Sequence, residues 1–186
     1  HNDDDQESLS HNANSVIAED GEGYIWVGGE GGLDRLDRKT GKFKRFRHDP
    51  NDPRSLSYNQ VRGLYVDKQG TLWVGTNIFF NPRDANGGLN RYDPKTESFT
   101  RYLHDPNDPR SLNDNRVVAI FEDSKGNFWV GTGGDGLHLM NREKGTFTRL
   151  TYNPAKPGKL TRPFISGSTP ATLPFASHIS SIIEDQ

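Results

Sequence analysis

Paired carboxylates are the residues of this sequence whose types could most directly do chemistry. Glutamate precedes aspartate at positions 19–20, 122–123 and 184–185, and two neighbouring carboxyl groups can serve a glycosidase as acid and nucleophile. A catalytic pair occurs once, however, whereas these pairs occupy one equivalent position of a repeated segment. We therefore interpret them as turn residues, and the sequence predicts no catalytic residue.

Two short segments resemble ligand-binding motifs when they are read in isolation. Residues 2–5 are acidic like a calcium loop, but they lack the glycine and the distal glutamate of an EF-hand. Residues 131–136 match G-x-G-x-x-G, but we expect a strand after them, where a dinucleotide site needs a helix. The six histidines show no metal-ligand spacing and cysteine is absent, so the sequence predicts no metal site and no cofactor.

Aromatic and basic side chains in two long loops form a stronger candidate for binding. Both loops are expected at the same end of their strands, because successive turns of an up-and-down sheet alternate between its two ends. Aromatic rings can stack on a sugar, and arginine can pair with a carboxylate or sulfate. The alternative is that these rings only attach the loops to the scaffold. The candidates are Phe79, Phe80, Arg83, Arg162 and Phe164.

A second candidate is a position that varies within an otherwise regular repeat. Seven residues before the repeated aspartate, the chain has in turn Ala13, Gln60, Arg116 and His178. An asymmetric ligand requires such variation, although drift at a solvated position would also produce it. We expect Gln60, Arg116 and His178 to line the mouth of a central channel, and we count them among the ligand contacts.

An internal repeat must position all of these residues. Trp26, Trp73 and Trp129 each lie in an apolar segment that continues Val-Gly, and the segment at 48–56 recurs unchanged at 104–112. In the third repeat, four short runs rich in β-branched and aromatic residues, at 117–122, 128–132, 137–141 and 147–151, are separated by turn residues. Four-stranded antiparallel units at a period of roughly 50 residues are typical of a β-propeller. A β-sandwich is the alternative, and the three tryptophans are expected at equivalent buried positions on the second strand of each unit.

The composition is compatible with such a fold and excludes several functions. Of 186 residues, 10% are aromatic and 20 are glycine, which suits short strands joined by tight turns. The net charge of −2 offers no electrostatic basis for binding nucleic acid. No apolar run approaches the roughly 20 residues of a membrane span, so we expect no direct membrane insertion of this segment.

The combined pattern resembles the two-component regulator propeller repeat. It reads Val-x-x-Ile-x-Glu-Asp-x-x-Gly-x-x-Trp-Val-Gly-Thr, then Gly-Gly-Leu, Phe-x-x-Tyr and Asp-Pro-x-x-Pro-x-Ser-Leu, and is best matched over 61–112 and 117–151. The resemblance implies seven-bladed propellers that form the periplasmic or extracellular sensors of histidine kinases and related receptors, many of them glycan-responsive. We therefore expect an all-β arc of three four-stranded antiparallel blades plus the first strand of a fourth.

The repeat boundaries divide the chain into blades. A seven-bladed ring needs about 350 residues, so we expect the end blades to contact the remainder of the propeller or, as the less favoured alternative, further copies of the chain. The expected division is the end of a preceding repeat at 1–13, blade 1 at 14–60, blade 2 at 61–116, blade 3 at 117–178 with a long loop at 152–177, and the start of a fourth blade at 179–186.

The resulting prediction is a ligand-sensing segment of a bacterial two-component-type receptor. It is expected to bind a carbohydrate or another small polar ligand and to have no catalytic activity of its own. The alternatives are a propeller-type carbohydrate-active lyase or hydrolase, and a protein–protein interaction platform.

Overall fold

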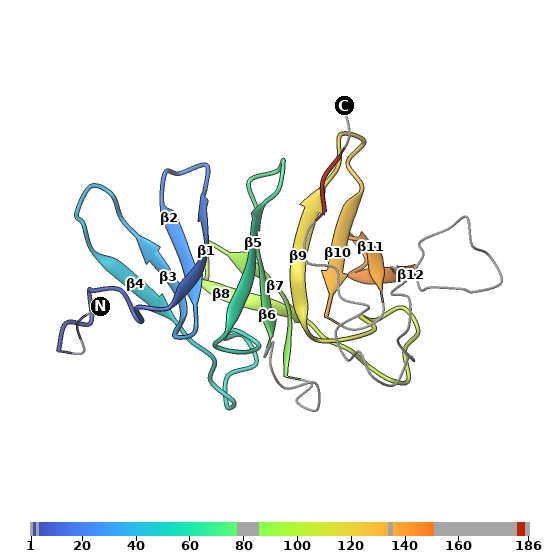
Figure 1. Cartoon of the computed structure of the whole chain (residues 1–186), viewed down its shortest axis with the longest axis horizontal. Coiled ribbons are helices and arrows are strands. Elements are labelled where there is room, and N and C mark those ends of the chain that lie inside the picture. Colours follow the sequence, from blue (N-terminus) through green and yellow to red (C-terminus); the bar gives the residue numbers. More distant parts are fainter. Residues whose placement is uncertain (1, 3, 78–85, 134–135, 151–181, 185–186) are drawn as a thin grey trace, which may run out of the picture.

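The protein forms three antiparallel four-stranded sheets that lie side by side in chain order (Figure 1). The computed structural model describes residues 2, 4–77, 86–133, 136–150 and 182–184, and all of its regular elements are strands. Blade 1 comprises β1–β4, blade 2 β5–β8 and blade 3 β9–β12. The strands are β1 (Asn14–Glu19), β2 (Ile25–Gly29), β3 (Gly32–Leu36), β4 (Phe43–Phe46), β5 (Val61–Val66), β6 (Leu72–Asn77), β7 (Gly87–Asp93), β8 (Ser98–Tyr102), β9 (Val117–Glu122), β10 (Phe128–Thr132), β11 (Leu137–Asn141) and β12 (Thr146–Leu150).

The predicted all-β fold is confirmed, and the strands of blade 3 agree with the expected ranges to within one residue. Among the first strands, β5 contacts both β1 and β9 across the sheet boundaries, as expected for the inner strands of a propeller. The expected loop at 152–177 lies outside the described residues, as does most of the expected start of a fourth blade. Within the described ranges, no helix has the length and apolar character that a membrane crossing requires.

One aspartate organises the turn between the first two strands of each blade. In blade 2, Asp67 Oδ1 accepts hydrogen bonds from the N–H groups of Gln69 and Thr71, at 3.0 and 2.9 Å, while Gly70 takes φ +80°. Asp67 Oδ2 accepts a third from Trp73 Nε1 at 2.8 Å. The same three bonds recur at Asp20 and Asp123. The repeated aspartates therefore serve the turns, as the sequence suggested.

The core consists of two apolar layers, one at each boundary between blades. Trp26 packs on Tyr92 of blade 2 with ring centroids 4.8 Å apart, and Trp73 packs on Phe128 of blade 3 at 4.7 Å. The glycine of the Trp-Val-Gly segment permits this approach, because a Cβ at Gly28 would lie 2.4 Å from Val61 Cγ1. Blades 1 and 2 thus each bury an apolar face against the sheet that follows.

The expectation that all three tryptophans are equally buried is wrong for Trp129. Trp26 and Trp73 are each 1% exposed, whereas Trp129 is only half-buried, although it occupies the equivalent strand position and donates the equivalent hydrogen bond to Asp123. The reason is geometric. A tryptophan of one blade is covered by the next blade, and no described sheet follows blade 3.

The loop between blades is wound around an arginine of the fourth strand. Arg101 of β8 donates to the carbonyl oxygens of Asp52, Ser55 and Leu56 at 2.7 to 3.0 Å. Arg149 makes the equivalent bonds in the next repeat, and Arg45 bonds the carbonyls of residues 5, 8 and 9. The acidic N-terminal segment is therefore a repeat loop whose carbonyl groups surround a guanidinium, as expected of a degenerate copy.

Three different side chains on the third strands perform one structural task. Each accepts a hydrogen bond, at 2.8 to 3.0 Å, from the backbone N–H of the residue that follows Ser-Leu in the preceding loop. The pairs are Ser10 with Asp34, Ser57 with Asn90, and Asn113 with His138. A buried N–H requires an acceptor, and the chemical identity of the acceptor is secondary. His138 is fully buried, and burial lowers the pKa of its imidazole to about 4.

The two tryptophan environments give a first prediction. Trp73→Phe and Trp129→Phe remove the same hydrogen bond to aspartate, but only the first also opens a void between two sheets. We expect Trp73→Phe to lower the free energy of unfolding by about 3 kcal/mol and Trp129→Phe by about 1 kcal/mol, measured by urea denaturation. Equal losses in the two variants would contradict the proposed role of the following sheet.

A second prediction concerns the acceptor at His138. The folded-state pKa of about 4 lies below the ordinary value of 6.5, so the unfolded chain binds the proton more readily between these values. The contribution of His138 to stability is complete above pH 6.5, falls as the pH drops toward 4, and amounts to at most about 3 kcal/mol. His138→Asn, which copies Asn90, keeps the acceptor and should flatten this part of the unfolding profile. Identical profiles for the two proteins between pH 4 and 6.5 would exclude this role.

Candidate functional site

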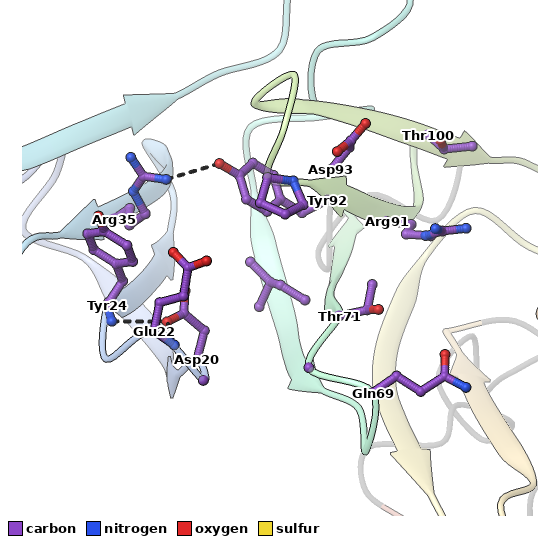
Figure 2. A pocket seen from close by; sticks show the side chains of 14 residues that line it. Asp20, Glu22, Tyr24, Arg35, Gln69, Thr71, Arg91, Tyr92, Asp93 and Thr100 are labelled. Carbon is purple, nitrogen blue, oxygen red and sulfur yellow. Dashed lines mark hydrogen bonds between the residues drawn. The ribbon is translucent and has the colours of Figure 1, made fainter.

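A groove of about 460 Å³ lies at the boundary of blades 1 and 2. It opens at the end of the sheets that carries the β1–β2, β5–β6 and β7–β8 turns (Figure 2). This is the end opposite to the one on which the sequence placed the ligand. Its lining residues are Asp20, Gly21, Glu22, Tyr24, Arg35, Gln69, Gly70, Thr71, Leu72, Arg91, Tyr92, Asp93, Pro94 and Thr100.

Asp20 shapes the blade 1 wall of the groove. Its Oδ1 accepts the N–H groups of Glu22 and Tyr24, each at 3.0 Å, and its Oδ2 accepts Trp26 Nε1 at 2.7 Å. The same turn carries Glu22, whose side chain is exposed and lies beside Asp20 in Figure 2. The turn therefore presents two carboxylates to one side of the groove.

Arg35 spans the groove from blade 1 to blade 2. Its guanidinium lies over the Tyr24 ring at 4.5 Å and donates to Tyr92 Oη at 3.1 Å (Figure 2). It also donates to Glu97 at 3.0 Å. A phenol that accepts a hydrogen bond retains its own proton for donation. Burial raises the pKa of Tyr92 to about 12, against the opposing effect of Arg35. Tyr92 is therefore a neutral donor at the floor of the groove.

The opposite rim carries a carboxylate that is ionised at neutral pH. The N–H of Lys95, and after it the hydroxyl of Thr96, hold the pKa of Asp93 below its usual range. Arg91 and Gln69 add polar side chains to this side (Figure 2). The groove thus combines acidic, basic and neutral hydrogen-bonding groups with two tyrosine rings, a set suited to a polar ligand.

The groove coincides with a break in the repeat. In blade 3, Arg142 pairs with Glu122 at 2.7 Å, and in blade 1 the equivalent Arg38 pairs with Glu19 at 2.9 Å. Strand register aligns these positions with Pro94 and Val66 of blade 2. Blade 2 has therefore lost both members of the pair. At the boundary with blade 1, the space that an arginine side chain would enter is open.

Glu97, which lies on the outer side of this boundary, has a strained backbone and forms ion pairs with blade 1. Its φ is +50°, and it stands where the other blades have Gly41 and Gly145. A side chain with positive φ costs roughly 1 kcal/mol. Glu97 in turn forms ion pairs with Arg35 and Lys44 of blade 1. The strained residue therefore joins the two blades next to the groove.

Neither of the two expected ligand contacts that the structure describes, Gln60 and Arg116, lines this groove. Gln60 and Arg116 lie at the other end of the sheets, where the Gln60 carbonyl accepts the N–H of Asn77 at 2.9 Å. Arg116 donates from Nε to Asp114 Oδ1 at 2.9 Å and from Nη2 to Asp114 Oδ2 at 2.6 Å. These hydrogen bonds raise the pKa of Arg116. The other six, Phe79, Phe80, Arg83, Arg162, Phe164 and His178, lie outside the described residues.

The sequence contained a signal for the groove that the search for variable loop residues missed. When the three repeats are aligned on tryptophan, only blade 2 lacks both the glutamate before the turn aspartate and the arginine after the third strand. A correlated loss of two charged partners in one repeat marks a gap. Among the described residues, no group of three or more His, Cys, Asp or Glu side chains is arranged to hold a metal ion.

Comparison with known proteins relates the repeats to one family. The profile of the family described as two component regulator propeller matches residues 8–31, 55–77 and 111–134. Over 135 residues, or 71% of the chain, the sequence is 32% identical to histidine kinase P4 from Formosa agariphila. The chain spans only 9% of the length of that kinase.

Solved structures from B. thetaiotaomicron have a similar arrangement. The extracellular domain assigned to the hybrid two component system BT3049 is 29% identical, has a TM-score of 0.66, and matches 82% of this chain and 20% of its own. The one assigned to the hybrid two component system BT4673 is 26% identical, has a TM-score of 0.59, and matches 78% of this chain and 19% of its own. The chain therefore spans about a fifth of these solved domains.

The strained turn at Glu97 gives a third prediction. Glu97→Ala and Glu97→Gly both remove the ion pairs to blade 1, but only glycine also relieves the positive φ. We expect Glu97→Gly to be more stable than Glu97→Ala by about 1 kcal/mol in urea unfolding. Because exposed ion pairs are screened, 1 M salt should reduce the difference between the wild type and Glu97→Ala. A more stable alanine variant would show that the backbone at this position is unstrained.

Proposed function

Because its three repeats belong to the two component regulator propeller family, we propose that this chain is a segment of the extracellular ligand-sensing propeller of a two-component-type receptor. The segment binds a carbohydrate or another small polar ligand and does not transform it. Its place is outside the cytoplasm, in the periplasm or beyond the cell surface. Signalling output belongs to other parts of such a receptor.

The observation that carries the ligand proposal is the groove at the broken repeat. A repeat protein that only builds a scaffold has no need for one boundary to differ from the next. Here, blade 2 alone has Val66 and Pro94 where the neighbouring blades have a paired glutamate and arginine. The groove that results is lined by hydrogen-bonding side chains.

The lining groups suit the hydroxyl-rich surface of a sugar. Tyr24 offers a ring face that is partly covered by Arg35, and Tyr92 offers a buried hydroxyl. Asp20, Asp93 and Gln69 supply acceptors from three different turns. A binding site uses a few such groups on a rigid frame to set orientation and specificity.

The engagement of the carboxylates favours binding over catalysis. Both oxygens of Asp20 already accept hydrogen bonds that hold its turn, and Asp93 is stabilised in its ionised form. A general acid of a glycosidase needs a raised pKa, whereas the pKa of Asp93 is lowered.

The outer faces of the arc are proposed to contact further blades. Ile17 of β1 is 71% exposed, although the equivalent Leu64 packs against the apolar layer between blades 1 and 2. Trp129 is likewise left half-covered on the opposite face. A propeller removes such faces by closing its ring, so the remainder of the propeller is the proposed partner, with further copies of the chain as the alternative.

Calorimetry with a panel of neutral, acidic and amino-substituted glycans tests the proposal and constitutes the fourth prediction. Tyr92→Phe removes one donor in the groove and should weaken binding by three- to tenfold. Gln60→Ala, at the opposite end of the sheets, should leave the affinity unchanged.

The opposite pattern, with binding lost in Gln60→Ala and retained in Tyr92→Phe, would move the site to the channel mouth. Absence of binding across the panel would refute the sensing role of this segment. Turnover of a bound glycan that disappears after a single Asp or Glu substitution would show that the segment is an enzyme.

A further inference from the structure

The boundary between blades 2 and 3 contains a complete binding site for a guanidinium group. Arg142 donates to Asp67 Oδ2 of blade 2 at 2.9 Å and to Glu122 Oε1 of blade 3 at 2.7 Å. Its guanidinium carbon lies 5.1 Å from the centre of the Phe128 ring. The site shows that a turn aspartate already bonded to its tryptophan still accepts a cation from the next blade.

The equivalent site between blades 1 and 2 keeps the aspartate and lacks the arginine. Asp20 corresponds to Asp67, while Pro94 replaces the arginine and Leu72 replaces the phenylalanine. Asp67 Oδ2 accepts two hydrogen bonds, from Trp73 and Arg142. Among the described residues, Asp20 Oδ2 accepts one, from Trp26. The groove therefore opens at Asp20 Oδ2, whose counterpart in the next blade, Asp67 Oδ2, accepts two hydrogen bonds.

The charges around this acceptor favour a cation. Glu22 takes the place of Gln69 in the turn and adds a second carboxylate to the rim. Arg35, a basic group that lines the groove on blade 1, is already engaged by Glu97, by Tyr92 Oη and by the Tyr24 ring. A guanidinium or ammonium group that enters beside Asp20 thus meets carboxylates on blade 1 and the Tyr92 hydroxyl on blade 2.

We propose that the groove binds the guanidinium or primary ammonium group of a ligand against Asp20, in the place that Arg142 fills at the next boundary. The inference rests on the proposed ligand-binding function and narrows its chemistry to a ligand with a cationic group. A free guanidino compound and an amino sugar both carry such a group, and the experiment distinguishes them.

The three indole N–H groups provide a direct readout. Each donates to the turn aspartate of its own blade, so the ¹H–¹⁵N spectrum of the chain reports each of these aspartates through one side-chain signal. Ethylguanidinium should shift the Trp26 signal saturably and leave those of Trp73 and Trp129 in place. Ethylurea, which has a similar shape and no charge, should shift none of them. For an amino sugar, the matched pair is glucosamine, which carries the ammonium group, and N-acetylglucosamine, which does not.

Two variants separate the site from a general effect of charge. Val66→Glu combined with Pro94→Arg restores the pair of blades 1 and 3 and should abolish the Trp26 shift. Glu22→Gln alters only an exposed side chain and should weaken ethylguanidinium binding by about threefold. An unchanged Trp129 signal in these variants verifies the fold, because Val66 adjoins Asp67, the acceptor of the Trp73 indole.

Three results would overturn the proposal. The Trp26 signal could stay in place with both ethylguanidinium and glucosamine, it could move equally with ethylurea and N-acetylglucosamine, or it could move together with the Trp73 and Trp129 signals. Neutral glycans that bind the wild type and not the double variant would, in that case, leave the broader sensing function intact. If neither cations nor glycans bind, both proposals fail.

Discussion

The whole arrangement depends on one constraint, which is that a sheet of this protein can bury its apolar face only against the following sheet. The hydrogen bond from the tryptophan indole to the turn aspartate makes this possible, because it satisfies the one polar atom of a side chain that is otherwise enclosed between sheets. Where the following sheet is present, as for Trp26 and Trp73, the indole is 1% exposed. Where it is not described, as for Trp129, the hydrogen bond persists and the burial does not.

Backbone groups that cannot reach water explain most of the remaining repetition. The Asp-Pro loops turn their carbonyl oxygens inward, and an arginine of the neighbouring strand supplies the donors. The N–H that follows each loop needs an acceptor, and Asp34, Asn90 and His138 all provide one. The loop sequence recurs because its geometry must recur, whereas the acceptor varies because only its hydrogen-bonding capacity matters.

The candidate site lies at the one described boundary between blades that departs from the repeat. A regular boundary closes around an arginine from the third-to-fourth-strand turn, as at Arg142. The boundary between blades 1 and 2 has the inner apolar layer of its neighbour, so it remains stable without that arginine. The ion pairs of Glu97 with Arg35 and Lys44 join the two blades on the outer side, despite the positive φ of Glu97. The groove is consequently an opening beside an apolar layer that still joins the two sheets.

The repeated tryptophan, aspartate and glycine determined the fold from the sequence alone, because strand alternation and tight turns are local and recur at equivalent positions. The strands of blade 3 could therefore be placed to within a residue. Only the tertiary structure decided which boundary is open, because the groove depends on how Asp20, Pro94 and Leu72 from different blades come together. The exceptional residues of the long loops predicted a site at the opposite end of the sheets, because a missing side chain creates space without leaving a conspicuous residue in the sequence. The missing arginine side chain of blade 2 leaves a groove only because blades 1 and 2 pack against each other.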